Sequence, residues 1–347
     1  MNAATALRAG DRVLVTRLNY LGDVVLSLSM VDALRATHPG IVIDYLAREP
    51  AASLLAGDDR FGQVIAWRDG AMNALRTVVR LRARRYRAVI DLYSNPRSAW
   101  LSWLSGAPVR IGGNRRGRRL LYTHRVQPPA GLPVSEVFMR YAQPLGVEGR
   151  PGKPVLGIAH AEAAAAEELL ARAGVRPLGA PRVGIHPGGK WPVKRWPSAH
   201  FAELVARVES LGARVVLLTG PDEHDATDAV QALLARPVPA LAPLPIRTTA
   251  AVISRLDAMV ACDGGIMHTA VAVGTPTVGI FGSSQSSVWF PYAGLGPFRA
   301  AEIQVECRPC HRHVCPLGHT RCLNDLTPAR VAADVDALLG SRAEQAP

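Results

Sequence analysis

The chain has 347 residues, of which 48% are hydrophobic, and its formal net charge is +12. This length exceeds one comfortable hydrophobic core, so two domains of about 100 to 200 residues each are expected. No apolar run reaches the ~20 residues needed to cross a bilayer, and the N-terminus lacks the apolar stretch of a secretion signal. These features exclude an integral membrane protein and predict a cytoplasmic one that at most touches a membrane surface.

Clustered arginines carry the positive charge. One cluster lies within residues 76–87 and a second within residues 115–119. Such surfaces attract polyanions, whether nucleic acid, anionic lipid or phosphorylated glycan, although solvated helix faces can have the same composition. The positive charge therefore predicts an anionic partner but does not identify its kind.

Apolar runs and amphipathic segments alternate through the first half of the chain. The pattern predicts strands at residues 12–16, 41–47, 64–67 and 88–92, and helices at residues 23–37, 51–55 and 72–84. Such alternation is typical of a parallel sheet covered by helices. A proline-rich loop at residues 128–133 and an alanine-rich helix at residues 162–173 follow.

A second set of alternating elements begins after a segment rich in Pro and Gly. It predicts strands at residues 182–186, 215–219 and 258–261, helices at residues 198–211, 225–234 and 248–254, and a last helix at residues 328–339. We therefore expect an N-terminal Rossmann-like domain at residues 1–174, a linker at 175–181 and a C-terminal Rossmann-like domain at 182–347. Two doubly wound α/β domains facing a cleft would bind ligands at the carboxyl ends of their strands.

The loop after the first predicted strand, RLNYLGD, ends at Asp23. A carboxylate at this position faces the ligand edge of the sheet, where it can accept a proton from an attacking hydroxyl. Aspartate is also a preferred helix N-cap, worth about 1 kcal/mol. A general base and a structural cap are therefore competing interpretations of this residue.

The strand at residues 182–186 continues into the segment HPGGKWPVKRWP. Residues 184–190 nearly match the phosphate-binding pattern G-x-x-x-x-G-K, but Trp191 and Pro192 replace the Ser or Thr and the helix that a kinase or ATPase loop requires. A glycine loop followed by cations still suits a diphosphate, although surface lysines beside a turn have the same pattern. The residues concerned are Gly188, Gly189, Lys190, Lys194 and Arg195.

Two further strand ends carry candidate ligand contacts. The turn TGPDEH offers Asp222 or Glu223 to a ribose hydroxyl, and a simple turn with solvated acids would look the same. The segment DGGIMH begins a helix whose N-terminal amides and dipole favour phosphate, and its glycines allow a close approach of the backbone. The candidates in this second segment are Asp263, Gly264, Gly265 and His268.

Taken together, these segments resemble glycosyltransferase family 9, the ADP-heptose:lipopolysaccharide heptosyltransferases. The resemblance runs from residue 12 to about residue 339 and is carried by RLNYLGDVVLSLSMVDALRATHP, HPGGKWPVKRWP and DGGIMHTAVAVGTPTVGIFG, in this order. It implies a two-domain GT-B fold and inverting transfer of a heptose from ADP-heptose to a lipopolysaccharide inner-core acceptor. It implies no catalytic metal, since protein groups would stabilise the departing ADP.

The resemblance also implies roles for individual residues. Asp23 matches the general base of the family, Lys194 matches its phosphate-contacting lysine, and Glu223 is nearest to its ribose-binding glutamate. The turn near the donor diphosphate and sugar corresponds to Asp263, Gly264, Gly265 and His268. Gly188 and Gly189 complete the expected donor site.

The acceptor side and the donor identity are less closely matched. Arg115 and Arg116 lie in VRIGGNRRGR, which resembles the basic segment of the acceptor domain and suits the phosphates of an inner core. Some heptosyltransferases have paired threonines in the donor loop where this chain has Gly189 and Lys190. Another nucleotide sugar, or a protein acceptor, therefore remains an alternative within the same class.

Four cysteines lie close together in CRPCHRHVCPLGHTRC, namely Cys307, Cys310, Cys315 and Cys322. Without a secretion signal, this C-x2-C-x4-C-x6-C array favours a tetrahedral Zn or a single Fe, with disulfides, free thiols or an iron–sulfur cluster as alternatives. Four thiolates leave no open position on a metal, so the expected role is structural. The remaining cysteine, Cys262, has the environment of a core residue.

The sequence favours three other functions less than it favours a transferase. A nucleic-acid-binding protein with a zinc knuckle would use the basic surface, but aromatic residues make up only 5% of the chain and no binding motif occurs. A nicotinamide oxidoreductase would need G-x-G-x-x-G after a strand, which is absent. A non-catalytic glycan-binding relative would have no need of Asp23 and Lys194 together.

Overall fold

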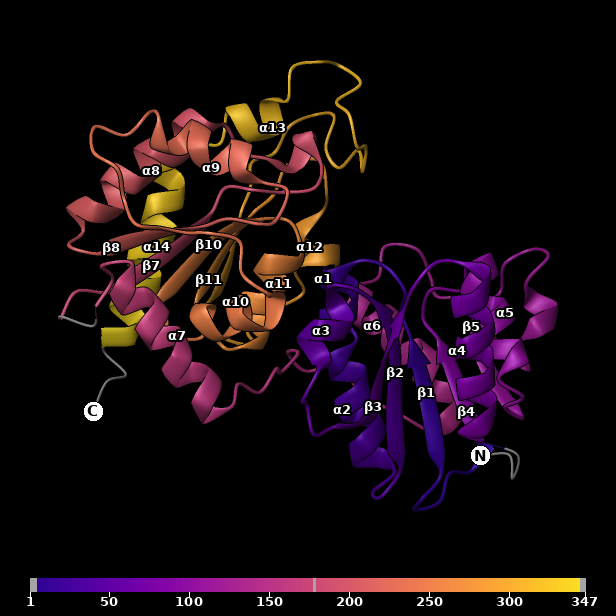
Figure 1. Cartoon of the computed structure of the whole chain (residues 1–347). Helices are drawn as coiled ribbons and strands as arrows, with labels where there is room; N and C mark the ends of the chain where they lie inside the picture. Colours follow the sequence, from indigo (N-terminus) through magenta and orange to yellow (C-terminus); the bar gives the residue numbers. More distant parts are fainter. Residues whose placement is uncertain (1–4, 177–178, 344–347) are drawn as a thin grey trace. The chain divides into compact units, whose positions relative to one another are not determined.

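A computed structural model describes residues 5–176 and 179–343. The chain divides between Pro154 and Val155 into two compact units. Each unit is built on a six-stranded sheet whose neighbouring strands are all parallel (Figure 1). The predicted class, two doubly wound α/β domains, is confirmed. Within the described ranges, no helix is both long enough and apolar enough to cross a membrane.

The first unit has the sheet order β3-β2-β1-β4-β5-β6. Its strands are β1 (Arg12–Thr16), β2 (Val42–Arg48), β3 (Phe61–Trp67), β4 (Ala88–Asp91), β5 (Val109–Gly113) and β6 (His124–Val126). Its helices are α1 (Leu21–Leu26), α2 (Leu28–Thr37), α3 (Ala51–Leu55), α4 (Ala71–Ala83), α5 (Pro96–Leu104) and α6 (Val134–Ala142), with 3-10 turns η2 (Arg119–Leu121) and η3 (Gln143–Leu145). Because parallel crossovers are right-handed, α4 and α5 cover one face of the sheet and α2 covers the other.

The single helix predicted at residues 23–37 is two helices, α1 and α2, which meet at Ser27. The Ser27 hydroxyl donates to the Val24 carbonyl at 2.7 Å and shares a 2.7 Å hydrogen bond with the hydroxyl of Tyr45 on β2. A serine side chain that bonds the preceding turn and a neighbouring strand competes with continuous helical bonding. The break leaves α1 as a short segment at the carboxyl edge of the sheet.

The second unit has the sheet order β12-β11-β10-β7-β8-β9. Its strands are β7 (Arg182–His186), β8 (Arg214–Leu218), β9 (Ala240–Leu241), β10 (Ala258–Cys262), β11 (Thr277–Ile280) and β12 (Phe298–Ala301). Its helices are α7 (His160–Arg172), α8 (Ser198–Ser210), α9 (His224–Gln231), α10 (Ile246–Ile253), α11 (Gly265–Ala272), α12 (Ser286–Trp289), α13 (Arg321–Asn324) and α14 (Pro328–Ala343), with the 3-10 turn η4 (Pro192–Lys194).

The boundary between the units lies before α7, not in the predicted linker at residues 175–181. Residues 177 and 178 of that linker lie outside the described residues. Helix α7 packs against α10. Ion pairs also join it to the second unit, at 2.7 Å from Glu162 to Arg247 and at 2.7 Å from Glu167 to Arg182. Helix α7 therefore belongs to the second unit, because its charged face is complementary to that unit.

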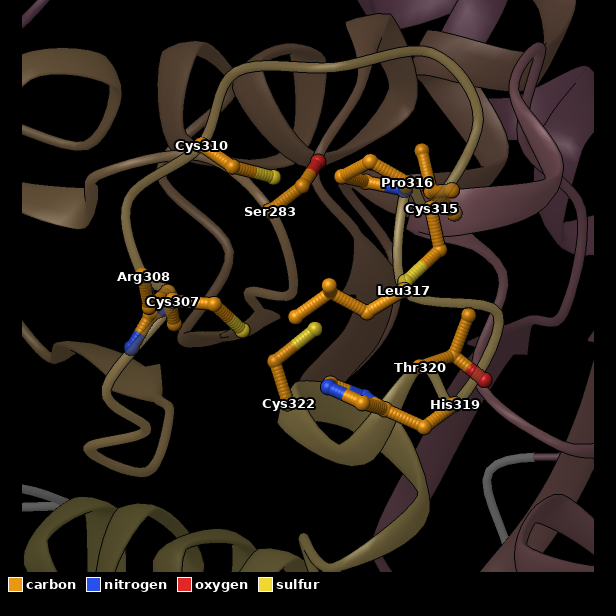
Figure 2. Close-up of a pocket in the computed structure, with 11 residues that line it drawn as sticks. Ser283, Cys307, Arg308, Cys310, Cys315, Pro316, Leu317, His319, Thr320 and Cys322 are labelled. Atoms are coloured by element: carbon orange, nitrogen blue, oxygen red, sulfur yellow. The ribbon is translucent and has the colours of Figure 1, made fainter.

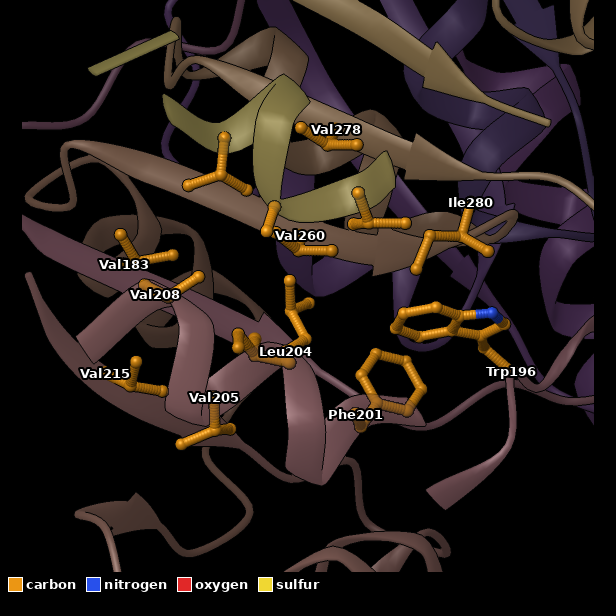
Figure 3. Packing of buried hydrophobic residues seen from close by; sticks show 14 of the residues in the cluster. Val183, Trp196, Phe201, Leu204, Val205, Val208, Val215, Val260, Val278 and Ile280 are labelled. Carbon is orange, nitrogen blue, oxygen red and sulfur yellow. The ribbon is translucent and has the colours of Figure 1, made fainter. Parts of the chain in front are cut away.

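The core of the second unit lies between its sheet and the helices α8 and α14. Figure 3 shows Trp196, Phe201 and Leu204 packed against valine and isoleucine side chains of the strands. The indole N–H of Trp196 donates to the Leu326 carbonyl at 3.0 Å, so its one polar atom is satisfied. Removing a large side chain from a core of this kind typically costs about 2 to 5 kcal/mol. This packing fixes the strand ends on which the site is built.

Candidate functional site

Each sheet has one point at which the order of its strands reverses. In the first unit this point lies between β1 and β4, and in the second it lies between β7 and β10. Ligands of open α/β sheets bind outside the carboxyl ends of the strands at such a point. The predicted base and the predicted donor residues follow strands at or next to these two positions, and the two half-sites are described separately.

Asp23 lies in the first turn of α1, just beyond the end of β1. The N-cap of this helix is Tyr20, so the alternative interpretation of Asp23 as an N-cap is wrong. The carboxylate is only 4% exposed, and its Oδ2 atom lies 2.6 Å from Arg17 Nη2. A carboxylate held in one orientation at the ligand edge is what a general base requires.

Arg17 is itself held by the segment that follows β4. Its Nη1 donates to the Leu92 carbonyl at 3.3 Å, and the guanidinium carbon lies 4.5 Å from the centroid of the Tyr93 ring. The planar guanidinium can bond a carboxylate and stack on an aromatic ring at once, which an ammonium group does less well. Asp23, Arg17 and Tyr93 therefore lie together at the strand reversal between β1 and β4.

The two predicted acceptor residues, Arg115 and Arg116, follow β5 and are both exposed. The charge of Arg115 reaches the phenol of Tyr141, as does the charge of Arg17. Burial dominates, however, and the pKa of Tyr141 is raised. Arg115 and Arg116 are therefore exposed cations in the loop that follows β5, the strand next to β4 in the sheet.

In the second unit, Glu223 is enclosed by the glycine loop that follows β7. Its Oε2 atom lies 2.9 Å from His186 Nε2, and a Cβ atom at Gly188 or at Gly220 would lie 2.2 Å from the same oxygen. Burial raises the pKa of Glu223, but the hydrogen bond and the charge of His186 outweigh this and the pKa is lowered. Asp222, the other candidate in this turn, is exposed. The geometry thus selects Glu223 as the fixed carboxylate.

Lys194 and Asp263 connect the loops that follow β7 and β10. Lys194 Nζ lies 2.5 Å from Asp263 Oδ2, and the hydroxyl of Ser284 donates to the same oxygen. Asp263 is buried, whereas Lys194 keeps about a fifth of its side chain exposed. The pair places one cation at the edge of the sheet beside the start of α11.

Helix α11 begins at Gly265, and its N-cap Gly264 provides no side-chain capping bond. Its first-turn N–H groups are therefore oriented toward the ligand edge, where they suit an anion. His268 lies one turn further on, is 2% exposed, and shares a 2.8 Å hydrogen bond between Nδ1 and the hydroxyl of Tyr292. Burial lowers the pKa of His268, and the charges of Asp263 and Lys194 act on it in opposite directions.

Cys262, the last residue of β10, is buried. Burial raises the pKa of the Cys262 thiol to about 12, and the charges of Asp263 and Glu223 add to the increase. The predicted role of this cysteine in the core is consistent with its burial. The other predicted cations have local partners, since Arg195 donates to the Gly189 carbonyl at 2.6 Å and Lys190 lies over the ring of Trp191.

The four remaining cysteines line one pocket, and all are free thiols. Figure 2 shows the sulfur atoms of Cys307, Cys310, Cys315 and Cys322 directed into it. Backbone N–H groups, that of Thr320 foremost, lower the pKa of Cys315. In the described part of the chain, no group of three or more His, Cys, Asp or Glu side chains is arranged to hold a metal ion. The thiols are soft ligands gathered at one place, but they would have to move closer together to form a closed ligand set.

The cysteine-rich loop is attached to the Lys194 side of the site. Arg308 donates to the carbonyls of Gly282 and Ser284. His313 stacks on Trp191 with ring centroids 3.8 Å apart and an angle of 2° between the planes. The loop therefore supports the segments that position Lys194 and Asp263.

Sequence reasoning missed several residues of these half-sites. Arg17 and His186 each hold a predicted carboxylate, and each directly follows or ends a strand, which is a position that could have identified them. Ser284 and Tyr292 come from segments without a recognisable motif. The partnership of Trp191 with His313 joins residues far apart in the chain, so no local pattern indicates it.

The chain was compared with known proteins. The sequence profile of glycosyltransferase family 9 (heptosyltransferase) matches residues 74–321. The chain is 26% identical to lipopolysaccharide heptosyltransferase 2 of Escherichia coli (strain K12), over 94% of this chain and 98% of that protein. The solved structure of E. coli ADP-heptose lps heptosyltransferase II is similar with a TM-score of 0.79 and 26% identity, over 96% of this chain and 100% of that one. A glycosyl transferase family 9 structure from Veillonella parvula DSM 2008 has a TM-score of 0.84 at 20% identity, over 97% and 99% of the two chains.

Two parallel-sheet units, each with charged residues at its strand reversal, define a glycosyltransferase with the GT-B fold. The chain belongs to glycosyltransferase family 9. The resemblance drawn from the sequence is thereby confirmed. The nicotinamide oxidoreductase and the nucleic-acid-binding alternatives do not fit this family.

Proposed function

We propose that this chain is an inverting heptosyltransferase that transfers a heptose from ADP-heptose to a lipopolysaccharide inner-core acceptor. The similarity to a lipopolysaccharide heptosyltransferase extends over nearly the full length of both chains. The observation that carries the mechanism is the buried pair of Asp23 and Arg17 at the strand reversal of the first unit. A glycosyltransferase of the same fold that uses another nucleotide sugar or a protein acceptor is the alternative.

In this proposal Asp23 is the general base. It takes the proton of the acceptor hydroxyl while the hydroxyl oxygen forms a bond to the anomeric carbon and the bond from that carbon to the ADP oxygen breaks. Arg17 keeps the carboxylate in position. Lys194 and the first amides of α11, from Gly264 and Gly265, stabilise the negative charge that develops on ADP. Groups of the protein thus accept the proton of the acceptor and stabilise the negative charge of the leaving ADP.

The donor nucleotide binds along the reversal of the second unit. Glu223, fixed by His186, accepts the ribose hydroxyls of the donor. Gly188 and Gly189 bring the backbone close to the nucleotide, and Asp263 with His268 border the diphosphate and the sugar. The closely paired Lys194 and Asp263 support this assignment, because an incoming diphosphate offers Lys194 a second anionic partner.

The acceptor binds on the first unit. Arg115 and Arg116 contact phosphates of the inner core, and a lipid-linked acceptor places the enzyme at the inner face of the cytoplasmic membrane as a peripheral protein. The exposure of both arginines supports this assignment. The expected location is the cytoplasm.

The cysteine-rich loop binds a structural Zn or Fe through Cys307, Cys310, Cys315 and Cys322. Support comes from the convergence of four free thiols on one pocket and from the lowered pKa of Cys315, which favours the thiolate that a metal requires. When bound, the metal would hold together an irregular loop of the second unit.

The base is tested with purified protein, ADP-heptose and truncated core acceptors. Asp23→Asn is expected to lower kcat/KM by about a thousandfold, the scale of a lost general base, while ADP affinity is kept. Asp228→Asn, an exposed aspartate on α9, is the matched control and should retain wild-type turnover. Equal turnover by the two variants would show that Asp23 is not the general base. A faster reaction with a different nucleotide sugar would favour the alternative donor.

A further inference from the structure

The positive charge of the chain is concentrated in one segment. Residues 70–135 contain thirteen arginines and no lysine, and their single acidic residue is Asp91. Asp91 is fully buried beneath the sheet edge, so no carboxylate of this segment reaches the surface. The segment has the same excess of twelve positive charges as the entire chain. Arg84 and Arg97 pair with carboxylates from outside the segment, Asp44 and Asp69, and the other arginines make its surface attractive to anions.

The same segment exposes large apolar side chains. Met72, Leu75 and Val79 are each close to 60% exposed on α4, and their spacing places them in one stripe along the helix. Trp100 and Trp103, one turn apart on α5, are 52% and 46% exposed and touch edge to face. Apolar groups of this size on a surface mark an interaction site when they gather together.

These side chains belong to adjoining elements. Helix α4 contacts α5, α5 contacts η2, and α4 and α5 cover the same face of the first sheet (Figure 1). Leu120 of η2 is 75% exposed and extends the apolar surface. Exposed arginines lie on the same elements, namely Arg76, Arg80, Arg82 and Arg119. We call this surface of α4, α5 and η2 the Trp–Arg face.

We propose that the Trp–Arg face docks on the anionic phospholipid headgroups of a bilayer. Tryptophan prefers the boundary between headgroups and acyl chains, and arginine stems cover apolar surface while their guanidinium groups bond phosphate. Helices with an apolar stripe flanked by arginines lie in this boundary and bind anionic lipids. Each arginine near such a surface contributes about fivefold in partition.

Other occupants match the face less well. A free glycan or nucleic acid would use the arginines but leave the apolar stripe of α4 in water. A second copy of the chain would bring two arginine-rich faces together, because the same patch meets itself in a twofold dimer. A bilayer uses both the apolar and the cationic groups.

The position of the face also suits a lipid-linked substrate, and here the inference rests on the proposed function. Helices α4 and α5 follow β3 and β4, so their N-terminal ends lie toward the carboxyl edge of the sheet, where Asp23 lies. An enzyme docked by this face would keep the lipid of its acceptor in the bilayer. The attached glycan would then extend toward the edge that carries the base.

The docking is tested by sedimenting the full-length protein with vesicles. The wild type is expected to bind vesicles of phosphatidylcholine with about 30% phosphatidylglycerol, to bind pure phosphatidylcholine weakly, and to dissociate as salt is added. Trp100→Ser combined with Trp103→Ser, and separately Arg76→Gln combined with Arg82→Gln, should each weaken partition by about tenfold or more. Leu233→Ser and Arg236→Gln, exposed residues of the second unit, are the matched controls and should bind like the wild type.

The second readout separates docking from catalysis. The tryptophan variant should keep its ADP affinity and its turnover of a deacylated, water-soluble acceptor, and lose turnover of the same glycan anchored in vesicles. Wild-type partition by both double variants would overturn the docking proposal, whether or not the chain transfers heptose. Tighter, tryptophan-dependent binding of single-stranded RNA than of anionic vesicles would overturn it as well. Intact vesicle binding without any transfer would contradict the proposed function alone.

Discussion

At the residue scale, the carboxylate of Glu223 occupies the space that side chains at two glycines would fill. A methyl group at Gly188 or Gly220 would lie 2.2 Å from Glu223 Oε2. A glutamate side chain moves more easily than the backbone of a loop. Either substitution is therefore expected to displace the carboxylate from His186 and leave the fold intact.

Gly188→Ala and Gly220→Ala should each weaken ADP binding by about tenfold, since a hydrogen bond to a charged group contributes about 1.5 kcal/mol or more. Their melting temperatures should stay close to that of the wild type. Gly157→Ala is the control, because a Cβ atom there would meet open space. Calorimetric titration with ADP measures the effect, and equal affinities of all three variants would contradict the assignment of Glu223.

The folded structure disfavours the protonated form of His268. Burial lowers its pKa to about 4, while the charges of Asp263 and Lys194 act in opposite directions on it. Between about pH 6.5 and about pH 4, the unfolded chain binds a proton at this residue that the folded chain does not. Its contribution to stability is therefore complete above this range and is lost as the pH falls through it.

Between about pH 7 and about pH 5, the wild type should lose about 2 kcal/mol more unfolding free energy than His268→Gln. Urea unfolding at both pH values measures the difference. His224→Gln, an exposed histidine on α9, is the control and should show the wild-type pH dependence. The same loss in His268→Gln and in the wild type would show that protonation of His268 is not coupled to unfolding.

At the element scale, sequence periodicity identified the elements with strong patterns and missed the weak ones. β1, β7 and α8 lie within a residue of their predicted ranges, because buried parallel strands and amphipathic helices have continuous signals. Residues 93–127 carry no predicted element, yet they form α5, β5, η2 and β6. Helix α5 is hard to recognise because its exposed face carries tryptophans where a water-facing helix has charges.

The cysteine-rich loop is the element whose stability should depend on a metal. Cys310→Ser is expected to lower the Zn or Fe content from about one ion per chain toward zero and to lower the melting temperature, since structural metal binding contributes to folding. Cys262→Ala is the matched control for metal content, because this thiol lies in the core and does not line the pocket. Elemental analysis of the purified proteins measures the content. An unchanged stoichiometry in Cys310→Ser would count against thiolate ligation.

At the scale of the whole molecule, the two units repeat one arrangement with different chemistry. Each has charged residues at a strand reversal, with an acid and its arginine in the first unit and a lysine with a buried acid in the second. The positions of Asp23, Lys194, Glu223 and Asp263 on these edges were predictable, because each follows a recognisable strand. Of their partners, His186 meets Glu223 across the ends of two neighbouring strands, which depends on strand order. Arg17 lies in the same loop as Asp23, but the sequence of a loop does not show which of its side chains pair.

The division of the chain was the least predictable feature at this scale. A segment rich in Pro and Gly usually separates domains, and residues 175–181 have that composition. The structure divides before α7 because acidic side chains on that helix pair with arginines of the second unit, such as Arg247 and Arg255. Long-range charge pairing of this kind leaves no local signal in composition.

The contact between Trp191 and His313 makes the fluorescence of this tryptophan sensitive to the position of the cysteine-rich loop. The indole lies face to face with an imidazole of the cysteine-rich loop and directly precedes the turn that carries Lys194. If the proposed metal is bound, a chelator that removes it would loosen the loop, as would an oxidant that modifies the thiols. One side of this ring would then be exposed to water, and its emission would shift toward the red. Because the chain has six tryptophans, the part of this shift that Trp191→Phe abolishes would report on the cysteine-rich loop and on the turn that carries Lys194.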